Sequence, residues 1–195
     1  MAIRSICVYA GSSPGAKPIY RDHAVALGRE LARQHITLIY GGASVGLMGI
    51  VADAVLAEGG SVTGVITESL VDHGISHNGL TNLEIVSSMH DRKGRMSDLS
   101  DGFIMLPGGF GTFEEFFEVV TWTQLGIHQK PCGILDVDGF FNPLFEILER
   151  AVEDRFMRIE HAQIVKGSSD PAELITLLSN YRPVVVEKWL DRSDR

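Results

Sequence analysis

The sequence has little cysteine: Cys7 and Cys132 are the only two in 195 residues, and both lie in apolar segments. Disulfide-rich secreted scaffolds are therefore excluded, and we interpret both as buried core thiols of a protein in a reducing compartment, the cytoplasm. No apolar run approaches the roughly 18 residues that a membrane-spanning helix needs. The N-terminal segment lacks the apolar region and cleavage site of a signal peptide. We expect neither membrane contact nor export.

The sequence also has few positively charged residues. Lys and Arg number 17 against 25 Asp and Glu, which gives a net charge of −8 and argues against nucleic acid as a partner. A small anion could still bind at one local site. The 45% hydrophobic and 22% charged residues are typical of a packed globular protein. We expect a single domain over residues 1–195, with the charged tail 187–195 at its periphery.

Short β-branched runs alternate with longer helical patterns along the whole chain. This alternation predicts βαβ units and an α/β fold: a Rossmann-like three-layer sandwich with a central, mostly parallel sheet. The expected strands are 3–9, 36–40, 61–66, 83–86, 103–106, 132–135 and 162–165. The expected helices are 17–34, 45–58, 89–99, 111–125, 143–154 and 171–180. The longest irregular stretch, about 68–82, is long enough for a functional loop.

Ligands of such sheets bind beyond the carboxyl ends of the strands. That rule selects four loops, at 11–13, 41–49, 87–93 and 107–112, which are rich in Gly, Ser or basic residues. In the last of them a buried strand runs into Gly108, Gly109 and Gly111, followed by Thr112 and a helix. Glycines let a ligand approach the backbone, and a helix N-terminus offers free N–H groups, so we predict a phosphate cradle. The alternative is a tight turn that uses glycine only for its backbone conformation.

The cradle suits one phosphate better than several. Glu114 stands where a dinucleotide-binding fingerprint has its third glycine, and no Gly-Lys-Ser/Thr follows. The acidic residues Glu114, Glu115 and Glu118 of the following helix could simply complement its dipole. Glu115, however, lies three residues after Thr112 and shares its face. A carboxylate there could activate water or stabilise a developing cation at a bound sugar phosphate.

A second segment places an arginine in an apolar helical stripe. Met89, Arg92, Met96 and Leu99 fall on one face of the helix at 89–99, so Arg92 either extends along the surface to water or faces the site and holds an anion or carboxylate. Glu115 is its candidate partner.

Other candidates are open or weak. The glycine-rich junction at 41–49 could bind an anion or allow close helix–sheet packing, and Ser12 and Ser13 could cap a helix or contact a ligand. His73 and His77 are four residues apart but lack a third nearby ligand, so we expect no metal site. Neither cysteine has the setting of a catalytic nucleophile.

Two motifs in this order, Met89-x-x-Arg92-Lys93 and Pro107-Gly108-Gly109-x-Gly111-Thr112-x-x-Glu115, resemble the LOG ("lonely guy") family of cytokinin riboside 5′-monophosphate phosphoribohydrolases, long mislabelled as lysine decarboxylases. The likeness extends from Cys7 to Gly126. It implies hydrolysis of the N-glycosidic bond of an adenine-type nucleoside 5′-monophosphate, with no metal or organic cofactor, in a homodimer. It also implies that Arg92 and Glu115 are the catalytic residues.

Substrate-binding residues follow from the resemblance and from the cradle together. We expect them to be Ser12, Lys93, Gly108, Gly109, Phe110, Gly111, Thr112, Phe113, Glu114 and Thr121. Two positions depart from the family pattern. Gly74 replaces a Glu that helps to hold substrate, so that base preference or affinity is in question, and Asp72 or His73 could substitute. Thr67 replaces the usual Pro, a change that we interpret as structural.

A second functional class is a non-catalytic nucleotide or molybdenum-cofactor carrier, since related folds bind such ligands without hydrolysis. A carrier would have no need of the Arg92/Glu115 pair. Lysine decarboxylation is disfavoured, because no lysine stands in a recognisable setting for a pyridoxal Schiff base.

Overall fold

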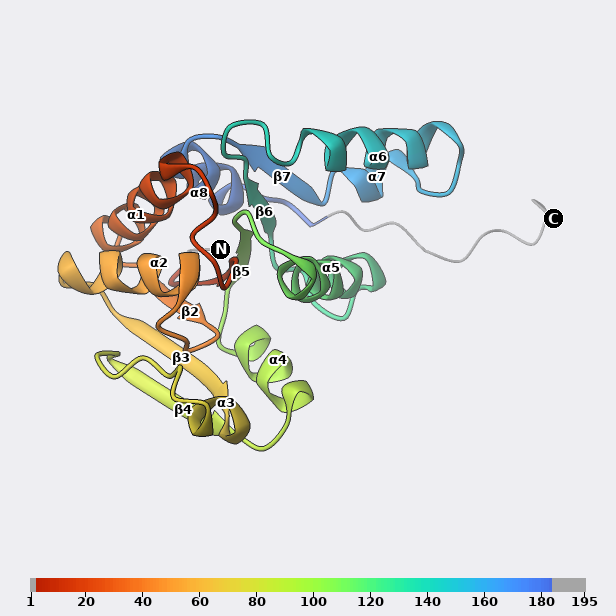
Figure 1. Cartoon of the computed structure of the whole chain (residues 1–195). Helices are drawn as coiled ribbons and strands as arrows, with labels where there is room; N and C mark the ends of the chain where they lie inside the picture. The colour runs from red at the N-terminus through yellow and green to blue at the C-terminus, as the bar shows by residue number, and fades with distance from the viewer. Residues whose placement is uncertain (1–2, 184–195) are drawn as a thin grey trace.

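The computed structural model describes residues 3–183 (Figure 1). The predicted peripheral tail at 187–195 lies outside the described residues. No helix among those described is both long and apolar enough to cross a bilayer.

The centre of the structure is a seven-stranded sheet in the order β4-β3-β2-β1-β5-β6-β7. Every strand pair in it is parallel, so the sheet is more uniform than the mostly parallel one that we predicted. The strands are β1 (Ser5–Tyr9), β2 (Thr37–Tyr40), β3 (Val62–Thr67), β4 (Asn82–Val86), β5 (Gly102–Met105), β6 (Cys132–Leu135) and β7 (Val165–Ser168). Their apolar, β-branched composition suits strands that are buried on both faces.

Helices cover both faces of the sheet and complete the predicted three layers (Figure 1). They are α1 (Pro18–Arg33), α2 (Gly46–Ala57), α3 (Glu68–Asp72), α4 (Met89–Asp98), α5 (Phe110–Leu125), α6 (Asn142–Glu153), α7 (Ile159–Ala162) and α8 (Pro171–Ser179). Alternate residues of β1 belong to different cores. Ile6 and Val8 pack with α1, α2 and α8, whereas Cys7 and Tyr9 pack with Met96 of α4 and with α5.

The largest error in the predicted elements is at the last strand. We predicted it at 162–165, but α7 ends at Ala162 and β7 spans Val165–Ser168. The stretch predicted as irregular, 68–82, contains α3. Both missed helices have four or five residues, too few to show a helical period in the sequence.

The carboxyl ends of the central strands gather the predicted loops at one edge of the sheet. The Gly11 N–H donates to the Pro107 carbonyl at 3.0 Å, and the Leu47 N–H at the start of α2 donates to the Gly11 carbonyl at 2.9 Å. Gly46 has a φ of +63°, and a Cβ on it would overlap the backbone of Ser12. Gly46 therefore permits the close approach of α2 to the loop after β1, and anion binding by residues 41–49 stays a prediction.

Candidate active site

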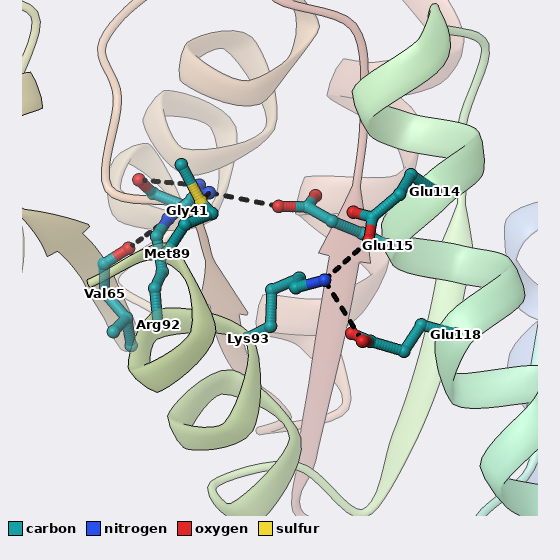
Figure 2. Close-up of polar contacts among 8 residues, drawn as sticks. All are labelled: Gly41, Val65, Met89, Arg92, Lys93, Glu114, Glu115 and Glu118. Atoms are coloured by element: carbon teal, nitrogen blue, oxygen red, sulfur yellow. Dashed lines mark hydrogen bonds and ion pairs between the residues drawn. The ribbon is translucent and has the colours of Figure 1, made fainter.

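Arg92 of α4 and Glu115 of α5 form a buried ion pair. Arg92 Nη1 lies 3.0 Å from Glu115 Oε1, and the two side chains are only 8% and 16% exposed. Figure 2 shows the two side chains extending toward each other from facing helices. The predicted partnership is confirmed, and the alternative of an arginine that extends to water is wrong, because the guanidinium group lies inside the protein.

Backbone carbonyls hold the guanidinium group from the sheet side. Arg92 Nε donates to the Val65 carbonyl at 2.9 Å, and Nη2 donates to the Gly41 carbonyl at 3.3 Å. The thioether of Met89 lies 3.2 Å from Nη1. A buried cation is costly unless its donors are satisfied, so these contacts fix both the position and the orientation of Arg92 (Figure 2).

Glu115 has a perturbed carboxyl group. Burial raises its pKa above the ordinary value, Arg92 partly offsets this, and Glu114 adds to the rise. Such opposing influences of burial and charge are typical of groups that exchange protons or stabilise charge in catalysis.

Lys93 supplies the second cation of the cluster. Its Nζ lies 2.5 Å from Glu114 Oε1 and 3.1 Å from Glu118 Oε1, and its side chain is largely buried. The bond to Glu114 contributes most to raising the pKa of Lys93, so the lysine is firmly charged. Glu118, which the sequence suggested only as a dipole partner, is thus part of the site (Figure 2).

The predicted cradle is an uncapped helix N-terminus. Gly109 occupies the cap position of α5, and no side chain caps the helix there. A Cβ on Gly109 or Gly111 would meet no atom within 4 Å, so space is open in front of the first turn. The first turn of an α-helix leaves N–H groups without partners in the helix, and the dipole favours an anion beside them.

Four other residues at or beside the cradle have different surroundings. Thr112 is buried, and a Cβ on Gly108 would overlap its hydroxyl, so this glycine permits a close approach of loop and helix. Phe113 packs edge-on against Phe141 in the core, whereas Phe110 is 96% exposed at the first position of α5.

A cavity of about 310 Å³ opens beside the cradle. Ser12 lines it together with Gly108 and Gly109, and the rings of Tyr20 and Phe140 form part of its wall. The volume is at the lower end of the range for small-molecule sites. The structure thus places Ser12 next to the cradle.

Thr121 is not brought into this cluster. Its hydroxyl donates to the Phe117 carbonyl of the same helix, its side chain is exposed, and it lies nine residues, about 13 Å of helix, beyond Thr112. The two histidines of the loop are also separately engaged, His73 with the Ser69 carbonyl and His77 with Asp53. Within residues 3–183, no three His, Cys, Asp or Glu side chains gather as metal ligands would.

Comparison with known proteins identifies the family. Residues 48–178 match a family model described as possible lysine decarboxylase. The chain is also 49% identical to a probable cytokinin riboside 5′-monophosphate phosphoribohydrolase of Oryza sativa subsp. japonica, over 92% of this chain and 74% of that protein. The chain belongs to the LOG family. Another rice LOG protein, a cytokinin riboside 5′-monophosphate phosphoribohydrolase, is 46% identical over the same shares of the two chains.

The LOG fold is shared with more distant proteins. The molybdenum cofactor binding protein of Rippkaea orientalis superposes with a TM-score of 0.68 over 91% of this chain and 96% of that one, at 22% identity. At that identity the likeness shows a common fold alone.

Gly74, where the resemblance leads us to expect a glutamate, has a left-handed backbone in this LOG chain. Gly74 follows α3 with a φ of +71°, and its N–H donates to the Val71 carbonyl at 2.8 Å. A glutamate in this left-handed conformation would be strained. Glycine is therefore the residue that suits this loop conformation without strain.

Proposed function

We propose that this LOG protein hydrolyses the N-glycosidic bond of adenine-type nucleoside 5′-monophosphates, AMP or its N6-prenylated cytokinin form, to the free base and ribose 5-phosphate. The observation that carries the proposal is the buried Arg92–Glu115 pair beside the open N-terminus of α5. A carboxylate and an anion site in this arrangement can hold the 5′-phosphate and act on the sugar. LOG relatives that carry this activity in their names support it.

In this mechanism the first turn of α5, from Gly109 to Thr112, binds the phosphate with its backbone N–H groups. Lys93, which is paired with Glu114 and Glu118, also contacts the nucleotide. Glu115 stabilises the positive charge that develops on the ribosyl C1′ as the bond to the base breaks, or activates the attacking water. Arg92 orients Glu115 and the nucleotide. We assign substrate contacts also to Ser12, Gly108, Phe110, Phe113 and Glu114. Thr121 keeps such a contact on the resemblance alone, with a part of the nucleotide away from the cradle.

The test is product analysis. Purified protein incubated with AMP, or with N6-isopentenyl AMP, should release base and ribose 5-phosphate in equal amounts, as measured by chromatography. Adenosine should be cleaved much more slowly, because it lacks the group that the cradle binds. Tight nucleotide binding without base release would contradict the proposal and favour a carrier.

The activity should depend on pH through Glu115. If its carboxylate is the active form, kcat/KM is retained above its pKa and lost as the pH falls through it. Because burial raises that pKa, the acidic limb should lie above the ordinary carboxyl value of 4.5. Arg92→Gln removes the cation that lowers the pKa, so the limb of its residual activity should move to higher pH. A limb that stays in place would contradict the coupling.

We also infer a homodimeric single-domain protein of the cytoplasm, with no nucleic-acid partner. Exposed apolar side chains on and beside α6 and α7 support self-association: Ile147 is 63%, Phe156 88% and Ile159 53% exposed. Light scattering should give twice the chain mass for the wild type and a lower mass for Phe156→Asp. A monomeric wild type would contradict the inference. The two free buried cysteines suit a reducing compartment, and the acidic net charge disfavours nucleic acid.

A further inference from the structure

Gly41, the residue directly after β2, lies against the guanidinium group of Arg92. A Cβ on Gly41 would overlap Arg92 Nη2, and it would lie 3.1 Å from Cζ and 3.7 Å from Nε. The guanidinium group therefore occupies the volume that any side chain at position 41 would need. Figure 2 shows Gly41 beside the end of the arginine, on the side away from Glu115.

The backbone of Gly41 does not itself require glycine. Its φ is not among the positive values of the described residues, and residues with side chains adopt such backbone conformations without strain. The steric conflict involves the far end of a long side chain, which can move, and not backbone or packed core. A side chain at position 41 should therefore displace Arg92 and leave the sheet intact.

The remaining contacts of Arg92 leave it no equivalent position. Nε is held by the Val65 carbonyl, Nη2 by the Gly41 carbonyl and Nη1 by Glu115. A planar group with donors on three sides cannot move away from Gly41 without lengthening at least one of these bonds. Movement away from β2 would disturb the pairing with Glu115.

We propose that Gly41 is a positioning residue of the active site: its missing side chain forms the slot that holds Arg92 in register with Glu115. Gly41 touches no reacting atom in this account, and it acts only through Arg92. The expected effect of a side chain at position 41 on turnover rests on the proposed function. Its expected effect on the position of Arg92 is independent of that function.

The kinetic test compares Gly41→Ala with Gly94→Ala, a substitution on α4 where a Cβ would meet no atom within 4 Å. Gly41→Ala should lower kcat at least about 30-fold while the KM for AMP changes less than about threefold, since the cradle on α5 is untouched. Gly94→Ala should retain wild-type turnover. A Gly41→Ala enzyme with wild-type kcat would overturn the proposal.

A double-mutant cycle separates positioning from a general structural role. With Arg92→Ala in place the slot is empty, so adding Gly41→Ala should lower turnover by no more than about twofold further. A full additional loss would show that Gly41 acts independently of Arg92 and would overturn the proposal. If Gly41→Ala alone fails to fold, the double variant should fold as well as Arg92→Ala does. A double variant that fails to fold where Arg92→Ala folds would assign Gly41 to the backbone and refute the slot.

An NMR measurement that does not depend on turnover tests the position of Arg92 separately from the proposed function. The Arg92 Nε–H group, bonded to the Val65 carbonyl, should give a slowly exchanging NMR signal that is assigned by its loss in Arg92→Ala. Gly41→Ala should shift or abolish that signal, and Gly94→Ala should leave it unchanged. An unmoved signal in Gly41→Ala would refute the slot even if the enzyme proved inactive on nucleotides. A moved signal in a protein without base release would refute only the proposed function.

Discussion

Glu115→Gln should lower turnover of AMP at least ~100-fold while its affinity for the nucleotide changes only a few-fold. The substitution preserves size and keeps an oxygen that can accept the bond from Arg92 Nη1, now 3.0 Å long. It removes the negative charge and the ability to take up a proton. Base release under saturating AMP, together with the AMP dissociation constant, measures the two effects separately.

Glu84→Gln provides the matched control. Glu84 pairs with another arginine of α4, Arg95, with Nε 2.6 Å from Oε2, and lies outside the site. Its substitution likewise removes a carboxylate charge and an ion pair, one that is more exposed, and turnover should be unchanged. Near-normal turnover in Glu115→Gln, or an equal loss in Glu84→Gln, would exclude the proposed role of Glu115.

Gly111→Asp should weaken binding of AMP at least ~50-fold and leave adenosine binding within about threefold. A Cβ at Gly111 meets nothing within 4 Å, so the fold has room for the new side chain. Its carboxylate would stand at the first turn of α5, where the phosphate is proposed to bind. Two unit charges about 5 Å apart repel by about 3 kcal/mol at an effective dielectric constant of about 20.

The neutral isostere Gly111→Asn is the control for size. Gly111→Asn should weaken the affinity for AMP far less than Gly111→Asp does, because asparagine adds the same bulk without the charge. Titration calorimetry with AMP and adenosine distinguishes the cases. Equal weakening of both ligands by Gly111→Asp, or equal effects of Asp and Asn, would place the phosphate elsewhere.

Much of the fold follows from local patterns in the sequence. The predicted central strands are within two residues of the observed ones because continuous β-branched runs between glycines have few alternatives. The helices α3 and α7 escaped prediction because such short segments depend on their surroundings more than on intrinsic propensity. The parallel direction of the strands follows from their alternation with helices, but no local pattern specifies their order in the sheet.

The pairing of Arg92 with Glu115 was predictable from helical spacing. Arg92 interrupts an apolar stripe of its helix, and Glu115 shares a helix face with Thr112, so both were expected to face the site. The two hydrogen bonds from Arg92 to the carbonyls of Gly41 and Val65 were not predictable. These carbonyls come together only because β2 and β3 pair side by side in the sheet. The glycine pair after β2, Gly41 and Gly42, was the one sequence feature that indicated close packing at this point. The expected place of Thr121 in the site came from resemblance, and its geometry gives it no contact with the cradle.

The most direct measurement is a crystal structure of Glu115→Gln soaked with AMP, in which the slow variant preserves the intact nucleotide. We expect the phosphate on the N–H groups of Gly109 to Thr112 at the start of α5. We also expect the ribosyl C1′ roughly 3–4 Å from the side chain at position 115, with Arg92 still beside that side chain. A nucleotide whose glycosidic bond lies away from Arg92 and position 115 would contradict the assignment of this pair as the site of cleavage.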